Sequence, residues 1–171
     1  MRTICTNVYQ FDELSETAKE SAILEMSHIN NFDQWWDFIY DDAKTIGLNI
    51  TSFDIERNKH AKGEFLLSAF EVCANVFLNH GETCDTYKTA LSFMDQWQPV
   101  FNAYMDEKSE HYESNDSESI MQDMESSLLD NMLSCYADML QKESGYLQSK
   151  EAIVETIKAN EYEFTENGKL I

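Results

Sequence analysis

The chain has 171 residues, 43% of them hydrophobic and 12% aromatic, which is enough apolar material for a core that needs no disulfide support. Thirty-two acidic side chains against twelve basic ones give a net charge of -20, which repels phosphate and argues against binding nucleic acid or an anionic membrane through a basic patch. The single Pro, the five Gly and the many helix-forming residues argue against a disordered chain and predict that helix predominates.

Targeting and redox features are expected to be absent from this chain. Arg2 is followed by mixed polar residues, unlike a signal peptide, and no apolar run approaches the roughly 20 residues that a membrane span needs. The four cysteines lie far apart without a CxxC pair, so we expect reduced thiols; they are Cys5, Cys73, Cys84 and Cys135. These features predict a cytoplasmic protein with a single domain over residues 1–171.

The N-terminal third is predicted to contain strand, helix, helix and strand in that order. Residues 3–11 are rich in β-branched and aromatic side chains, which favour a strand. Ser15 can cap a helix. The apolar side chains at helical spacing around it are Leu14, Ala18, Ala22, Ile23 and Met26. A second helix is expected over 33–46, and alternating polarity then predicts a strand over 48–57 with a bulge near Thr51.

The middle of the chain is predicted to be a strand and two helices. Residues 63–68 begin like a strand, and the helix that follows should stop at Gly81. Its expected apolar face comprises Phe70, Ala74, Phe77 and Leu78. A long helix is expected over 84–109, where Pro99 removes a backbone donor and should kink or split it.

The C-terminal part is predicted to be two helices and an extended segment. A helix over 117–145 carries a broad apolar stripe, and a shorter one over 149–159 precedes an extended end with a tight turn at Gly168. The stripe comprises Met121, Met124, Leu128, Leu129, Met132, Leu133, Cys135, Met139 and Leu140. The fold class predicted is α+β and dominated by helix: the four strand segments form one small antiparallel sheet, with five or six helices mainly on one side.

Motifs of the common enzyme classes do not occur in the sequence. The isolated glycines form neither a GxGxxG nor a GxxxxGK loop, and there is no GxSxG elbow. The spacing of His80 and Cys84 would suit two metal ligands, with His60 and His111 as further donors, but zinc needs three or four convergent ligands. We therefore predict no catalytic residues, no metal site and no cofactor.

Acidic side chains are the candidate partner-binding groups. Eight carboxylates and a single Lys lie between Asp106 and Glu125, a pattern typical of a charged connection between helices. In a chain with 32 acids many carboxylate pairs arise by chance, so most of them are expected to form a solvated face. The residues predicted to contact a partner are Asp41, Asp42, Asp54, Glu56, Asp106, Glu107, Glu110, Glu113, Asp116 and Glu118.

Four blocks of sequence are distinctive when taken together: YQFDELSETAKESAI, WWDFIYDDAKTIGLNITSFDIERNKHAKGEF, NHGETCDTYKTA and EYEFTENGKLI. They resemble a family of small acidic proteins encoded by bacteriophages and prophages. The resemblance covers residues 9–90 and, more weakly, the C-terminal tail, while residues 95–150 carry no part of it. It supplies no catalytic residues and implies an accessory factor against host defence, such as an anti-CRISPR protein.

Two non-enzymatic functions and one weaker enzymatic alternative follow from these features. The first is an inhibitor in the host cytoplasm that covers the Lys and Arg groups with which a CRISPR effector complex grips DNA, by partial mimicry of DNA charge. The second is an antitoxin-like or other protein-binding module, and the third is a metal-dependent hydrolase. The stripe of the 117–145 helix adds a homodimer hypothesis, whose alternative is that the stripe is core.

Overall fold

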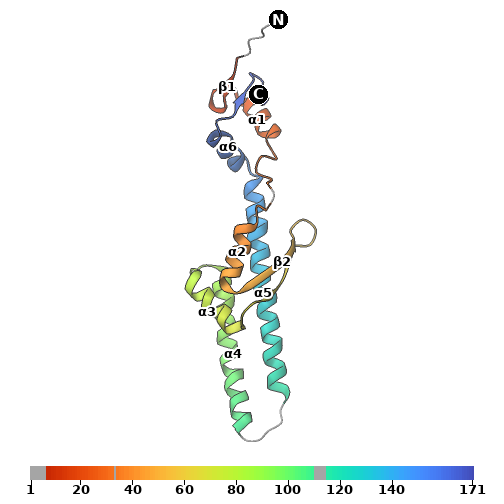
Figure 1. The fold of residues 1–171 in the computed structure, drawn as a ribbon, viewed down its shortest axis with the longest axis vertical. Coiled ribbons are helices and arrows are strands. Elements are labelled where there is room, and N and C mark those ends of the chain that lie inside the picture. The colour runs from red at the N-terminus through yellow and green to blue at the C-terminus, as the bar shows by residue number, and fades with distance from the viewer. Residues whose placement is uncertain (1–6, 33, 110–114) are drawn as a thin grey trace. The chain divides into compact units, whose positions relative to one another are not determined.

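A computed structural model describes residues 7–32, 34–109 and 115–171, and the side chains of these residues except 106–109 and 115–117. The described elements are, in chain order, β1 (Tyr9–Gln10), the 3-10 helix η1 (Phe11–Glu13), α1 (Glu16–Glu25), α2 (Asp37–Ile46), β2 (Leu48–Asp54), β3 (His60–Phe65), α3 (Ala69–Asn79), α4 (Asp85–Ser109), α5 (Asn115–Leu147), α6 (Lys150–Ala159) and β4 (Glu163–Phe164) (Figure 1). This confirms the predicted α+β class, in which helix dominates. Within the described ranges, no helix combines the length and the apolar character that crossing a membrane requires.

The strands form two separate two-stranded antiparallel sheets, where the sequence predicts a single sheet. β1 pairs with β4, and β2 pairs with β3. The register of the second pair shifts between Ile50 and Ser52, which confirms the bulge predicted there. The prediction of a single sheet was wrong because alternating polarity indicates only which residues are extended. Which strand pairs with which depends on contacts between distant parts of the chain.

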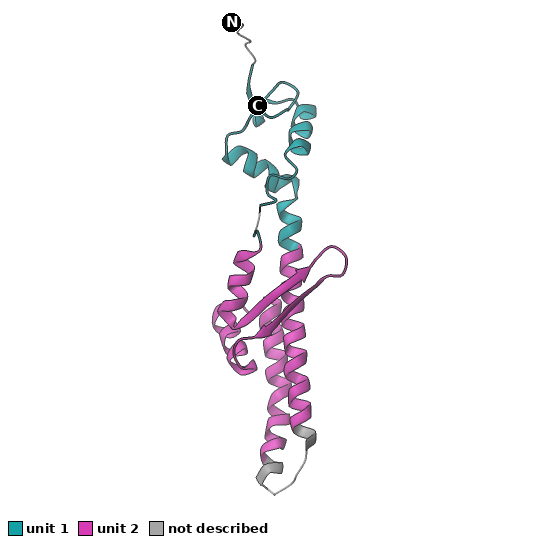
Figure 2. Ribbon diagram, turned by 45° about the vertical axis from the view of Figure 1, so that its right-hand side comes forward, with its two compact units in different colours: residues 1–35, 142–171 teal, residues 36–141 magenta. Residues whose placement is uncertain are grey.

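The contacts divide the chain into two compact units (Figure 2). Unit 1 comprises residues 1–35 and 142–171, and unit 2 comprises residues 36–141. Unit 1 therefore joins segments from the two ends of the sequence, as the pairing of β1 with β4 also shows. A single domain over residues 1–171 requires that both units unfold in one cooperative step, and it stays a prediction.

The core of unit 1 lies among η1, α1, α6 and β4. Its buried side chains are Phe11, Leu14, Ala18, Ala22, Met26, Ile153, Ile157 and Phe164. All but one of the apolar residues predicted at helical spacing around Ser15 belong to this core, and the remaining one, Ile23, is partly buried against it. The apolar face of α1 is therefore the one that the sequence predicts.

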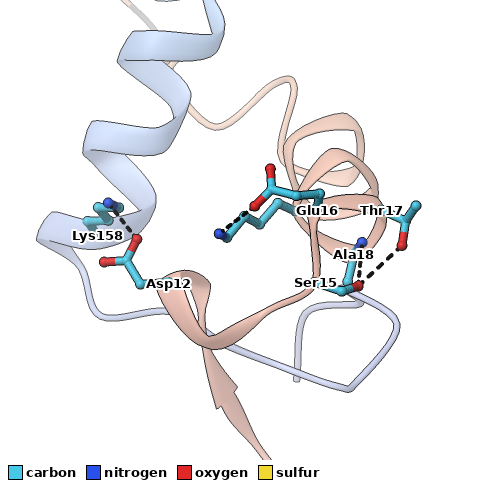
Figure 3. Close-up of polar contacts among 7 residues, drawn as sticks. Asp12, Ser15, Glu16, Thr17, Ala18 and Lys158 are labelled. Carbon is cyan, nitrogen blue, oxygen red and sulfur yellow. Dashed lines mark hydrogen bonds and ion pairs between the residues drawn. The ribbon is translucent and has the colours of Figure 1, made fainter.

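Polar contacts fix the start of α1 and the end of α6 in unit 1 (Figure 3). The hydroxyl of Ser15 accepts a hydrogen bond of 3.3 Å from the backbone N–H of Ala18, which satisfies one of the free donors at the helix start and confirms the predicted cap. On the other side of the core, the Lys158 ammonium lies 2.6 Å from the Asp12 carboxylate. Exposed pairs of this kind contribute about 1 kcal/mol or less, so burial of the apolar side chains contributes more to the stability of the unit.

Unit 2 contains α2, the β2–β3 hairpin, α3, α4 and most of α5. α4 and α5 run side by side in both views (Figures 1 and 2), and the Thr89 hydroxyl lies 3.6 Å from the Cys135 sulfur between them. The hairpin contacts α5 through an ion pair of Lys59 with Asp138. Members of the predicted stripe that are buried by the chain itself are Leu128, Met132, Leu133 and Leu140. Much of the stripe is therefore core, and the homodimer hypothesis stays a prediction.

Pro99 does not split α4, so the split predicted as one of two outcomes is wrong, while the kink stays a prediction. The helix is continuous from Asp85 to Ser109 with Pro99 inside it. Proline removes the N–H that would bond the carbonyl of Asp95, four residues earlier. Both residues are exposed, so water can bond that carbonyl, which explains why the helix continues.

The face of α3 that packs on the core is the opposite of the predicted one. The buried residues of α3 are Ala69, Val72, Cys73 and Val76. From the predicted face, Phe70 is 40% exposed and Leu78 is 82% exposed. Both faces of this helix are apolar in sequence, so periodicity alone cannot select the one that is buried.

Candidate partner-binding surface

The two long helices of unit 2 and their connection carry half of the net charge of the chain. Eleven Asp or Glu residues and a single Lys lie between Thr89 and Gln141. Five of these carboxylates belong to the described side chains and are exposed. They form what we call the acidic surface: Asp95 on α4, and Glu118, Asp123, Glu125 and Asp130 on α5.

On α5 the acidic surface consists of two rows. Glu118 and Glu125 are seven residues apart, as are Asp123 and Asp130, so each pair lies on one side of the helix. At 1.5 Å of rise per residue, the members of a pair are about 10 Å apart along the axis. Successive base pairs of DNA are only about 3.4 Å apart along a strand. The acidic surface therefore supplies negative potential without copying the spacing of phosphates.

Most of the other predicted contact residues lie elsewhere or outside the described side chains. Asp41 on α2 is exposed and its carboxylate is 3.7 Å from the Lys44 ammonium. Of the run from Asp106 to Glu118, the structure describes the side chain of Glu118 alone, which is exposed. The predicted residues outside the described side chains are Asp106, Glu107, Glu110, Glu113 and Asp116.

Asp54 and Glu56 lie at the turn of the β2–β3 hairpin. The Asp54 carboxylate accepts hydrogen bonds from the backbone N–H groups of Arg57, at 3.1 Å, and Glu56, at 2.9 Å. These bonds hold the pKa of Asp54 below its ordinary value. Asp54 therefore has a structural role in the turn. Glu56 is exposed, and contact of its carboxylate with a partner stays a prediction.

Asp42 lies at the edge of a polar cluster in unit 2, and its side chain is 46% exposed. Its carboxylate accepts a hydrogen bond of 2.8 Å from the Tyr136 hydroxyl, which is fully buried. The same carboxylate oxygen lies 3.4 Å from Nε2 of His80, without hydrogen-bond geometry, and Nδ1 of His80 lies 2.7 Å from the Thr86 hydroxyl. Burial, together with the bond to Asp42, raises the pKa of Tyr136 above its ordinary value. Asp42 is thus a structural acceptor as well as a half-exposed surface acid, and its contact with a partner stays a prediction.

Three groups of the same cluster have the composition of a hydrolytic triad: the Asp42 carboxylate, the His80 imidazole and the Thr86 hydroxyl follow one another in space. In such a triad the hydroxyl oxygen must reach a substrate carbonyl. Thr86 is 0% exposed, and the His80 side chain is 7% exposed. A substrate cannot reach this hydroxyl in the described structure, so the arrangement favours a structural role for the cluster.

A cavity of about 450 Å³ lies between α4 and α5. The titratable side chains in its wall are Lys88 and Asp123, and Lys88 is bonded to Asp85 at 3.1 Å. The wall also contains the hydroxyls of Thr89, Ser92 and Ser127, and the Ser92 hydroxyl accepts a hydrogen bond of 2.9 Å from the Gln96 side-chain amide. Among the side chains that the structure describes, no group of three His, Cys, Asp or Glu could hold a metal ion, and His111 lies outside that part of the chain.

Removing the carboxylate of Asp42 is expected to destabilise the protein by about 2 kcal/mol, because the buried Tyr136 hydroxyl then loses its acceptor. Asp42→Asn keeps an acceptor and should lose less than about 1 kcal/mol, and Asp41→Ala should stay within about 0.5 kcal/mol. The double variant Asp42→Ala, Tyr136→Phe should be more stable than Asp42→Ala alone, since both partners are then gone. Urea unfolding of the four variants measures this, and a double variant less stable than Asp42→Ala would contradict the structural role.

Comparison with protein-family models, with curated proteins and with solved structures finds no match for this chain. The acidic surface and the cluster around Asp42 therefore have to be interpreted from their own chemistry. Of the acidic surface, sequence reasoning named Glu118 as a contact residue and missed Asp95, Asp123, Glu125 and Asp130. A count of charges along each predicted helix would have included all four.

Proposed function

We propose that the protein is a non-enzymatic inhibitor that binds a nucleic-acid-handling complex of a bacterial host, and that a CRISPR effector is the favoured target. The acidic surface of unit 2 carries this proposal. Its five exposed carboxylates belong to the stretch of 53 residues from Thr89 to Gln141. Lys108 is the single basic residue in this stretch, so little positive charge within it offsets the potential of the carboxylates. The resemblance to small acidic phage proteins agrees with this target and with action in the host cytoplasm.

The mechanism we propose is competition with nucleic acid for a basic surface. Effector complexes hold their heteroduplex in a positively charged channel and read its backbone geometry. Clustered carboxylates attract such a surface at long range and raise the association rate, and the close charge pairs then slow dissociation. The wide spacing of the acidic rows suits lysines and arginines on flexible stems, which do not require phosphate-like separation.

The proposal that the protein catalyses nothing is supported by two observations. The Thr86 hydroxyl beside His80 is fully buried, and the titratable groups in the wall of the cavity between α4 and α5 are Lys88, which is paired with Asp85, and Asp123. If the weaker alternative of a hydrolase applied, an activity screen with Mg²⁺, Mn²⁺ and Zn²⁺ would detect turnover.

A pull-down from host lysate, read by mass spectrometry, tests the proposed function. We expect the parent protein to capture a nucleic-acid-binding protein or ribonucleoprotein, and the Glu118→Lys, Glu125→Lys, Asp130→Lys variant to capture much less of it. Capture of a toxin or an unrelated enzyme would instead favour the antitoxin-like module. Equal capture by the parent and the variant would contradict a role of the acidic surface.

A further inference from the structure

α3 exposes large apolar side chains in addition to the face that it buries in unit 2. Among its 11 residues only Glu71, Asn75 and Asn79 are polar. One face is buried in unit 2, while the other presents Phe70 and Leu78, 40% and 82% exposed. Glu71, Asn75 and Asn79 are four residues apart and form one polar stripe, so Phe70 and Leu78 are exposed apart from both this stripe and the buried face. Exposed apolar side chains that extend into a larger patch mark an interaction site.

A groove of about 370 Å³ lies beside this second face, between α3 and α4. Its wall contains Phe70, Ala74 and Phe77 from α3, and Met94 from α4. Two ring contacts show that the helices run antiparallel here: Phe70 packs on Trp97, with centroids 5.2 Å apart, and Phe77 packs on Tyr87, 5.0 Å apart.

The apolar surface extends beyond the groove along α4. Leu91 and Phe101 are three residues before and seven residues after Met94, so they lie on the same side of the helix. Their exposed fractions are 47% and 39%. We call the exposed and half-buried side chains of this region, Phe70, Phe77, Leu78, Leu91, Met94 and Phe101, the apolar face.

The charges beside the apolar face are negative. Glu71 contributes to the wall of the groove, and its carboxylate is held by hydrogen bonds from the Ser68 hydroxyl and backbone N–H, which keep its pKa below the ordinary value. Asp95 is exposed next to Met94. α3 contains no Lys or Arg, and Lys88 of α4 is bonded to Asp85.

This charge distinguishes between two occupants of the apolar face. A second copy of the chain would bring together two molecules of net charge -20, which repel each other. A helix with apolar side chains on one side and Lys or Arg on its flanks would pack its apolar side in the groove and place its basic side chains near Glu71 and Asp95. We propose that the apolar face of α3 and α4 docks a basic amphipathic helix of a partner protein, with its apolar side in the groove.

The proposal does not depend on the four carboxylates that α5 contributes to the acidic surface, although Asp95 of α4 belongs to both. α3 is about 16 Å long, so a docked helix of roughly three turns would cover it. The probe is a synthetic peptide of 14 residues made of Leu and Lys, with Leu at positions i, i+3, i+4 and i+7. A scrambled peptide of the same composition carries the same charge without an apolar side. Fluorescence anisotropy at about 0.15 M salt measures both affinities. At this salt concentration, screening limits unspecific electrostatic attraction to a range of roughly 8 Å.

We expect the parent to bind the patterned peptide at least about tenfold more tightly than the scrambled one. Leu78→Gln with Leu91→Gln should abolish this preference, and Leu78→Gln alone, at a side chain 82% exposed, should reduce it without any effect on folding. Leu24→Gln is the matched control, because Leu24 is 76% exposed on α1 of unit 1, and it should keep the preference. Equal affinity of the parent for both peptides, or a preference that survives in the double variant, would overturn the proposal.

Two further measurements separate this proposal from the alternatives. If the parent self-associates at micromolar concentration and the Leu78→Gln, Leu91→Gln variant is monomeric in sedimentation, the occupant is a second copy and the proposal is wrong. The Glu118→Lys, Glu125→Lys, Asp130→Lys variant should keep the preference for the patterned peptide. Loss of the preference in that variant would show that the groove does not act independently, and would overturn the assignment to α3 and α4.

Discussion

Replacing Glu118, Glu125 and Asp130 by Lys is expected to weaken binding of the host partner by at least about 30-fold, with little change in folding stability. Loss of one desolvated interfacial charge pair costs about 2 to 5 kcal/mol, and 2 kcal/mol already corresponds to a factor of about 30. All three side chains are exposed, and substitutions of that kind usually change stability by about 0.5 kcal/mol or less. Calorimetry of the purified complex and urea unfolding measure the two quantities.

A matched control separates the local effect from the change in total charge. Glu20, Glu25 and Glu166 are exposed carboxylates of unit 1, and replacing them by Lys changes the net charge by the same amount. We expect this control to bind the partner within about threefold of the parent at 0.15 M salt, because none of the three side chains belongs to the acidic surface and salt screens the effect of total charge. If the control loses as much affinity as the α5 variant, only the total charge matters and the acidic surface is not a site.

Gly168→Ala is expected to destabilise the protein by about 3 kcal/mol, through strain at the turn before the C-terminus. Gly168 has a φ of +77°, where an L-residue is disfavoured by roughly 1 to 2 kcal/mol. A Cβ at this position would also overlap the carbonyl oxygen of Ala18 on α1. That oxygen belongs to the backbone, so no side-chain rotation can relieve the contact.

Gly145→Ala in the same unit should have the opposite sign. Gly145 is exposed inside α5, and nothing lies within 4 Å of the Cβ that alanine would add. Alanine is favoured over glycine in a helix interior by roughly 0.5 to 1 kcal/mol, so this variant should be more stable than the parent. Urea unfolding followed by circular dichroism measures both variants. Equal stability of Gly168→Ala and the parent would show that the C-terminal turn does not pack on α1 as described.

Local signals in the sequence predicted the local features of the fold. Ser15 caps α1 as expected, because an N-cap is a contact between residues three apart. The phase slip near Thr51 predicted the bulge in β2 for the same reason, since the alternation is read along one strand. The turn at Gly168 was likewise visible from the Asn-Gly pair, and its N–H bonds the carbonyl of Thr165 at 2.9 Å.

Features that depend on distant contacts could not be predicted in the same way. The pairing of β1 with β4 joins the two ends of the chain, and no pattern within either segment specifies that partner. The buried face of α3 was assigned wrongly because both faces are apolar. Asp42 resembled its neighbour Asp41 in sequence, and only the Tyr136 hydroxyl, 94 residues away, shows that it is a structural acceptor.

Competition with nucleic acid tests the proposed role of the acidic surface most directly. The host partner captured on the immobilised protein at about 0.05 M salt would be challenged with increasing amounts of the nucleic acid that it normally binds. We expect that nucleic acid displaces the partner as its concentration rises, because both would occupy the same basic surface of the partner. A partner that stays bound in a large excess of its nucleic acid, at low and high salt alike, would contradict the claim that the acidic surface occupies a nucleic-acid-binding site.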